Sequence, residues 1–195
     1  MPTLFATVGT TEFPPLMSFL TSTSFIDQLV ANKVTKLTIQ YGRSTDPLTA
    51  LTALSDFKLG TSTPPFTSTL THKTLTLTSF PLAPSLLPSF AAHTHTISHA
   101  GAGTILDCAP TNTRLMIIPN ETLMNNHQVE LAAVLPVPIH TARLGDEDLS
   151  TKIDDFLGAE KEVGGETGGG NMDVFLKIVE GEIEKGPKPA MCFVL

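Results

Sequence analysis

The sequence contains few cysteines, few basic side chains and no long apolar run. Its two cysteines, Cys108 and Cys192, are too few for a disulfide framework, so we expect a reducing compartment. Twelve basic residues against 19 acidic ones give a net charge of −7, and such a surface repels the phosphates of nucleic acids. No stretch approaches the roughly 18 apolar residues of a membrane-spanning helix, and the start lacks the basic and apolar regions of a signal peptide. These absences predict a soluble, cytosolic protein that does not bind nucleic acid.

The composition is that of a folded domain. Hydrophobic residues make up 41% of the 195 residues and charged residues only 16%, which allows a substantial core and argues against disorder. Short apolar runs alternate with helix-like segments, which predicts an α/β fold with a mainly parallel sheet. The expected strands are Thr3–Val8, Lys36–Tyr41, Thr74–Phe80, Thr94–Ser98, Arg114–Pro119 and Val137–Ile139. The expected helices are Pro14–Lys33 with a break near Ser22–Ser24, Ser85–Ala92, Thr104–Ala109 and Asn125–Leu135.

Three regions depart from this rhythm. Thr45–Thr71 is rich in Thr, Ser and Pro, and we expect it to be irregular. Gly158–Gly170 is expected to be a flexible loop, and Asn171–Lys185 has the apolar spacing of an amphipathic helix. We therefore divide the chain into an α/β domain (1–157), a glycine-rich flexible loop (158–170) and a C-terminal amphipathic helix and tail (171–195).

One predicted loop has the features of a diphosphate site. In "ISHAGAGTILDC", Gly101, Ala102 and Gly103 follow a strand and precede a helix. Free backbone N–H groups at a helix start attract anions, and small residues let a diphosphate approach them. Asp107 lies about one turn further on, where it could accept hydrogen bonds from a ribose. The alternative is a tight turn whose acid merely complements the helix dipole.

Two further loops would lie at the same carboxyl edge of the sheet, where ligands of parallel sheets bind. In "NETLMNNHQVELA", the uncharged polar residues Asn126, His127 and Gln128 suit hydrogen bonds to sugar hydroxyls, although an Asn here could simply cap a helix. The turn Gly9-Thr10-Thr11 adds hydroxyl groups after the first strand. Together the three loops predict a site for a phosphorylated sugar.

No metal site is expected. The acidic run Asp146–Asp148 imitates the motif of metal-dependent transferases, but it stands at a polar helix start and is expected to be a solvated face. We likewise expect no cofactor.

The motifs "FATVGTTEF", "ISHAGAGT" and "IIPNETLMNNHQVELA" occur in an order that resembles the catalytic subunits of the dolichol-linked N-acetylglucosaminyltransferase. The chain is similar, more distantly, to the C-terminal lobe of the bacterial lipid II-forming GlcNAc transferase. The resemblance implies a Rossmann-like domain that forms a single lobe of a two-lobed, GT-B type glycosyltransferase. It covers roughly Thr3 to Leu135.

The resemblance also implies a role for each loop in binding UDP-GlcNAc. Gly9, Thr10 and Thr11 would approach the diphosphate, and Gly101, Ala102 and Gly103 would form the turn beside the nucleotide. His127 and Gln128 would bind the GlcNAc hydroxyls, with Asn126 beside them. Asp107 stands where the family usually has Glu to hold the ribose, and Asn112 stands where it usually has Gly. Asp is one methylene shorter than Glu, which makes the ribose contact the least secure of these assignments.

The family's reaction implies a lipid-linked acceptor and a second subunit. An inverting transfer of GlcNAc to GlcNAc-diphosphodolichol would form a β1,4 link, the chitobiosyl step of N-glycan precursor synthesis. One lobe without an anchor implies a membrane-bound second subunit that supplies the other lobe at the cytosolic face of the endoplasmic reticulum. The C-terminal helix would dock on that partner or cover its own domain. The catalytic base would come from the partner or from His99, whose alternative role is a turn histidine packed on the sheet.

Of two rival functions, the sequence leaves the first open and argues against the second. A non-catalytic nucleotide-sugar binding module that regulates a partner would need the same loops. A nicotinamide-dependent oxidoreductase would need G-x-G-x-x-G after the first strand, and "GTTEFP" does not supply it.

Overall fold

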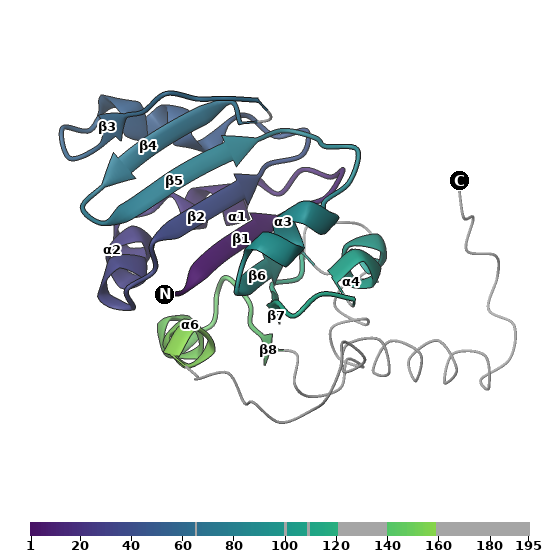
Figure 1. Cartoon of the computed structure of the whole chain (residues 1–195). Helices are drawn as coiled ribbons and strands as arrows, with labels where there is room; N and C mark the ends of the chain where they lie inside the picture. Colours follow the sequence, from purple (N-terminus) through teal and green to yellow (C-terminus); the bar gives the residue numbers. More distant parts are fainter. Residues whose placement is uncertain (65, 100, 109, 121–139, 159–195) are drawn as a thin grey trace, which may run out of the picture.

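The computed structural model describes residues 1–64, 66–99, 101–108, 110–120 and 140–158 (Figure 1). Within them one eight-stranded sheet has the order β3-β4-β5-β2-β1-β6-β7-β8. Its strands are β1 Thr3–Thr7, β2 Lys36–Gln40, β3 Lys58–Leu59, β4 Ser68–His72, β5 Leu75–Phe80, β6 His95–Ser98, β7 Arg114–Ile117 and β8 His140–Thr141. The six strands from β5 to β8 along the sheet run parallel. At the other edge, β4 pairs antiparallel with β5, and β3 pairs antiparallel with β4. The prediction of a mainly parallel, Rossmann-like α/β fold is confirmed.

The central strands are buried on both faces, because each face carries a layer of helices. Alternate residues of β1 separate accordingly: Leu4 and Ala6 belong to one core cluster and Phe5 to the other. Parallel register sets Thr7 beside Gln40 of β2 and Ser98 of β6 at the carboxyl ends of these strands. The order β5-β2-β1-β6-β7-β8 therefore places β1 and β6 at the point where the chain's direction along the sheet reverses.

The described helices are α1 Pro14–Leu20, α2 Thr23–Ala31, the 3₁₀ helix η1 Pro47–Ala53, α3 Leu87–Ala92, α4 Ala102–Cys108 and α6 Leu149–Gly158. Core residues of α1, α2, η1 and α6 share one cluster, and those of α3 and α4 share the other. The predicted break after α1 is confirmed. There Ser22 accepts a hydrogen bond from the Phe25 N–H and so begins a new helix.

The expectation that Thr45–Thr71 is irregular is wrong. This segment forms η1, β3 and most of β4, and the side chain of Asp46 links its helix to neighbouring strands. The Asp46 carboxylate accepts hydrogen bonds from the Leu48 N–H (3.1 Å) and from the hydroxyls of Ser68 (2.5 Å) and Ser79 (2.8 Å). A carboxylate that joins a helix start to two strands organises a segment whose Thr and Ser content alone suggests a loop.

Other elements differ from expectation by a few residues. Helix α3 begins at Leu87 rather than Ser85, and α4 begins at Ala102 rather than Thr104. Gly103 therefore lies in the first turn of a helix rather than in the loop before it. The helix expected at Asn125–Leu135, the strand at Val137–Ile139 and the C-terminal helix at Asn171–Lys185 lie outside the described residues. Gly158 ends α6, and the rest of the predicted Gly158–Gly170 loop also lies outside them.

Candidate functional site

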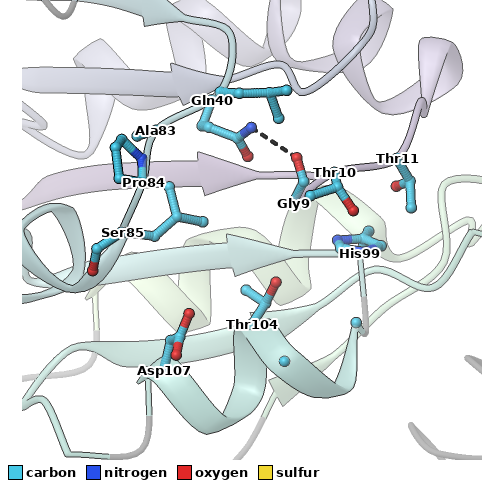
Figure 2. A pocket seen from close by; sticks show the side chains of 14 residues that line it. Gly9, Thr10, Thr11, Gln40, Ala83, Pro84, Ser85, His99, Thr104 and Asp107 are labelled. Atoms are coloured by element: carbon cyan, nitrogen blue, oxygen red, sulfur yellow. Dashed lines mark hydrogen bonds between the residues drawn. The ribbon is translucent and has the colours of Figure 1, made fainter. Parts of the chain in front are cut away.

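A pocket of about 410 Å³ lies at the carboxyl edge of the parallel strands, over the ends of β1, β2, β5 and β6 (Figure 2). Its volume is in the range of small-molecule sites. The lining residues are Gly9, Thr10, Thr11, Gln40, Leu82, Ala83, Pro84, Ser85, Leu86, His99, Gly101, Gly103, Thr104 and Asp107. Two of the three loops predicted from the sequence thus meet in one cavity, at the position where open α/β sheets bind ligands.

The turn after β1 is held in a fixed shape. The backbone N–H and the hydroxyl of Thr11 both donate to the Val8 carbonyl, at 3.2 Å and 2.8 Å. Gly9 has a φ of +60°, a conformation that residues with a Cβ rarely adopt. The Gly9 N–H donates to the Thr7 hydroxyl at 3.1 Å. The predicted turn is therefore present, and its glycine is required by the backbone itself.

His99 lies between the two glycine-bearing loops. Its side chain is only 3% exposed. A Cβ placed on Gly101 would lie 2.6 Å from His99 Nε2, and one placed on Gly9 would lie 3.2 Å from His99 Cε1. Gly9 and Gly101, which the sequence suggests for the approach of a ligand, thus make room for this imidazole.

Burial lowers the pKa of His99, and the nearby Thr7 backbone offsets part of that effect. The imidazole is therefore neutral at pH 7. Its Nδ1 makes no hydrogen bond of regular geometry within the described part of the chain. A neutral imidazole beside the pocket can accept a proton, but its low pKa makes it a weak base.

Helix α4 forms another wall of the pocket. Thr104 and Asp107 project from it toward the hollow (Figure 2), and Asp107 is exposed. A Cβ on Gly103 would meet no atom within 4 Å. Gly103 therefore differs from Gly101, because the described protein atoms leave open space where its side chain would be. Ala102 lies in α4 beside them.

Sequence reasoning missed one wall of the pocket. Leu82–Leu86, the segment after β5, and Gln40, the last residue of β2, both line it. The signal was available, since "FPLAPS" follows a predicted strand and Gln40 is polar at the end of another. Strand order decides that these two carboxyl ends adjoin the Gly9 turn, and strand order is not visible in local sequence.

The third predicted loop is described only at its beginning. Asn120 is buried, and its side-chain amide donates to the Glu12 carbonyl at 3.2 Å. This contact brings the start of the loop beside the Gly9–Thr11 turn. Asn126, His127 and Gln128 lie outside the described residues.

Two carboxylates of the acidic run Asp146–Asp148 form ion pairs with Lys152. Lys152 Nζ lies 2.7 Å from Asp146 Oδ2 and 2.9 Å from Asp148 Oδ1. Its hydrogen bond to Asp146, together with that of the Arg143 N–H, lowers the pKa of Asp146. In the described part of the chain no three His, Cys, Asp or Glu side chains are arranged to hold a metal ion. None of the helices described there combines the length and apolar character needed to cross a bilayer.

Similarity to known proteins identifies the family of this chain. The family model of the glycosyltransferase family 28 C-terminal domain matches residues 3–161. The chain belongs to this family. The family 28 assignment covers every described element and removes the oxidoreductase alternative.

Two relatives illustrate the similarity in sequence. The chain is 32% identical over 136 residues to the human UDP-N-acetylglucosamine transferase subunit ALG13, a match that covers 69% of this chain and 10% of the relative. It is 28% identical over 148 residues to the subunit of the same name from Yarrowia lipolytica, covering 76% and 67%. The chain thus spans about a tenth of the human relative and about two thirds of the Yarrowia protein.

Solved structures support the fold. The NMR solution structure of ALG13 superposes with a TM-score of 0.56 at 25% identity, covering 73% of this chain and 78% of that one. The crystal structure of Acinetobacter baumannii MurG matches with a TM-score of 0.53 at 14% identity, covering 82% of this chain and 42% of that one. The described domain therefore has the fold of one GT-B glycosyltransferase lobe.

Proposed function

We propose that this chain is the donor-binding subunit of a heteromeric, inverting glycosyltransferase that uses UDP-GlcNAc. The acceptor is GlcNAc-diphosphodolichol, and the product is the β1,4-linked chitobiosyl lipid of N-glycan precursor synthesis. One observation carries the proposal. The Gly9–Thr11 turn, the Gly101 loop and Asp107 line one pocket at the sheet's carboxyl edge, in a chain whose relatives are named UDP-N-acetylglucosamine transferase subunits.

Different residues of the proposed site suit different parts of a nucleotide sugar. Gly9, Thr10 and Thr11, with Gly101, Ala102 and Gly103 opposite, offer backbone N–H groups and hydroxyls to the diphosphate. Asp107 accepts hydrogen bonds from the ribose. Asn126, His127 and Gln128 bind the hydroxyls of GlcNAc.

The chemistry needs a good leaving group and an activated acceptor. The acceptor's 4-hydroxyl attacks the anomeric carbon, and UDP leaves from the opposite face of the sugar. Backbone donors around the diphosphate stabilise the developing negative charge in a preorganised way. The base that takes the hydroxyl proton is supplied by the partner or by His99, which is held neutral by its burial.

A partner is supported by the names of the relatives, which are transferase subunits. The MurG match covers 42% of that chain, which supports a second lobe outside this one. We propose that a membrane-anchored subunit supplies it and recruits this chain from the cytosol to the endoplasmic reticulum. Residues 1–157 form the donor domain and residues 158–170 a linker. The amphipathic segment Asn171–Lys185 binds the partner.

Reconstitution tests the proposal. The full chain is combined with a candidate membrane subunit in vesicles, and UDP-GlcNAc and GlcNAc-diphosphodolichol are added. The expected product is the disaccharide lipid, detected by mass spectrometry, with none formed by either subunit alone. Gln128→Ala is expected to abolish transfer while leaving subunit association intact, and deletion from Asn171 onward is expected to abolish association.

The outcomes separate the alternatives. Binding of UDP-GlcNAc without transfer in the presence of the partner would favour a non-catalytic nucleotide-sugar module. Failure of the chain to bind UDP-GlcNAc with the partner present would contradict both. Unchanged association after the deletion would assign the C-terminal segment to this chain's own domain.

A further inference from the structure

Gln40 connects the two sides of the pocket. It is the last residue of β2, the strand between β1 and β5, and its side chain is only 1% exposed. Its Nε2 donates to the Gly9 carbonyl at 2.8 Å, drawn in Figure 2, and to the Pro81 carbonyl at 2.6 Å. One amide group therefore joins the turn that follows β1 to the segment that follows β5.

The orientation of this amide is determined by its neighbours. Gln40 Oε1 accepts a hydrogen bond from the Thr7 hydroxyl at 2.5 Å, and the same hydroxyl accepts the Gly9 N–H at 3.1 Å. A flipped amide would direct its oxygen at two carbonyl oxygens, so the observed orientation is the one the network permits. Both N–H groups of Gln40 are then used within the protein. The side chain has no donor left for a ligand, although it lines the pocket.

We propose that Gln40 is a positioning residue that sets the distance between the Gly9–Thr11 turn and the 81–86 segment, and thereby the fit of the donor. The turn carries a left-handed glycine, and the 81–86 segment has no regular secondary structure before Leu87. Neither wall is held by sheet pairing, so a buried side chain anchored in the central strand is an effective way to fix both. The inference rests on the proposed donor site. It adds a residue that acts through the pocket walls rather than on the substrate.

The chain offers a matched control on the same strand. Thr38 precedes Gln40 by two residues and so faces the same side of the sheet. It is also 1% exposed, and its hydroxyl bonds Thr78 Oγ1 (3.1 Å) and His93 Nε2 (2.9 Å), away from the pocket. Thr38→Val removes buried hydrogen bonds without touching either wall.

Hydrogen exchange of the full-length chain measures the positioning directly and needs no ligand. Gln40→Met keeps the size of the side chain and removes its hydrogen bonds. We expect the hydrogen-bonded amides of Gly9 and Thr11 in the turn, and that of Leu87, which donates to Ser85 Oγ, to exchange at least about tenfold faster than in Thr38→Val. If Gln40→Met fails to fold, Thr7→Val leaves Gln40 in place but removes the hydroxyl that orients its amide, and the Leu87 amide is expected to exchange faster. Gly9 is not compared in this variant, because the Thr7 hydroxyl is also the acceptor of the Gly9 N–H. Exchange within about twofold of the Thr38→Val control in the folded variants would overturn the inference.

Calorimetry of UDP-GlcNAc binding adds the functional consequence. The Kd of Gln40→Met is expected to rise about tenfold or more, and that of Thr38→Val to stay near the wild-type value. An unchanged Kd in Gln40→Met, with the walls loosened, would overturn the link between the wall distance and the donor. A wild-type chain that binds no UDP-GlcNAc would contradict the proposed donor site, while the exchange rates would still decide whether Gln40 holds the walls.

Discussion

Two glycines of this pocket, Gly101 and Gly103, differ in whether the surrounding protein leaves room for a side chain. Gly101 and Gly103 stand two positions apart in "HAGAGT", and either could be there for the approach of a ligand. The His99 ring occupies the space into which a Gly101 side chain would point, whereas the corresponding space at Gly103 is open. Gly101 is therefore required by the protein's own packing, whereas no described protein atom explains the glycine at position 103.

This difference predicts opposite outcomes for two alanine substitutions. Gly101→Ala forces the buried imidazole to move, so we expect the free energy of unfolding to fall by about 1–3 kcal/mol. Gly103→Ala adds a methyl group in open space within a helix and is expected to leave stability unchanged or raise it by up to about 1 kcal/mol. Urea denaturation of both variants gives the comparison. Equal stabilities would show that His99 does not constrain the loop.

At the scale of elements, α6 belongs to the folded core although its sequence is polar at the start. Ile153 and Phe156 are 1% and 0% exposed, and Phe156 packs edge-on against His95 of β6 and His140 of β8. Gln28 and Asn32 at the end of α2 both donate to Asp154 Oδ1, at 2.8 Å and 2.7 Å. The helix therefore closes the sheet face that α2 begins to cover.

Phe156→Ala tests this role. Removal of a fully buried ring leaves a cavity between α6 and the strands, and we expect a loss of about 3–5 kcal/mol in the free energy of unfolding. Asp155→Ala, at the exposed neighbouring position, is the control and is expected to change stability by less than about 0.5 kcal/mol. Thermal denaturation distinguishes them. Similar melting temperatures would mean that α6 is not part of the cooperative unit.

At the scale of the whole molecule, buried imidazoles make stability depend on pH. Burial lowers the pKa of His93, His95, His99 and His140, and lowers that of His95 to about 4. Arg114 contributes to the effect at His95, and its guanidinium lies 3.1 Å from His140 Nε2, which can accept that hydrogen bond only when unprotonated. Between a pKa of about 6.5 in the unfolded chain and the lower folded values, the unfolded state binds more protons. The free energy of unfolding therefore rises with pH across that window and falls on acidification.

We expect the melting temperature to decrease continuously from pH 7 to pH 5, where the carboxylates with lowered pKa, Asp27 and Asp146, are still ionised. His95 alone accounts for roughly 2 kcal/mol of the loss at pH 5. Scanning calorimetry of the wild type and of His95→Gln, which cannot titrate, should show a shallower pH dependence in the variant. Parallel pH profiles would contradict the assignment to His95.

Much of the fold and of the site could be anticipated from local sequence. Apolar runs such as "KLTIQY" and "RLMIIP" identify buried strands, and the Gly9 and Gly101 loops identify two walls of the pocket, because period and backbone permissiveness are properties of short segments. The elements within 45–71 could not be anticipated in this way. Their organisation depends on Asp46 meeting Ser68 and Ser79, residues 22 and 33 positions away.

The local pattern of residues was therefore enough to predict an α/β domain with glycine-bearing loops at one edge of its sheet. The third wall of the pocket, the link made by Gln40 and the two different reasons for Gly101 and Gly103 required the folded chain. Each of them depends on which strands are neighbours, and neighbours in the sheet are set by packing between residues distant in sequence rather than by the residues adjoining them.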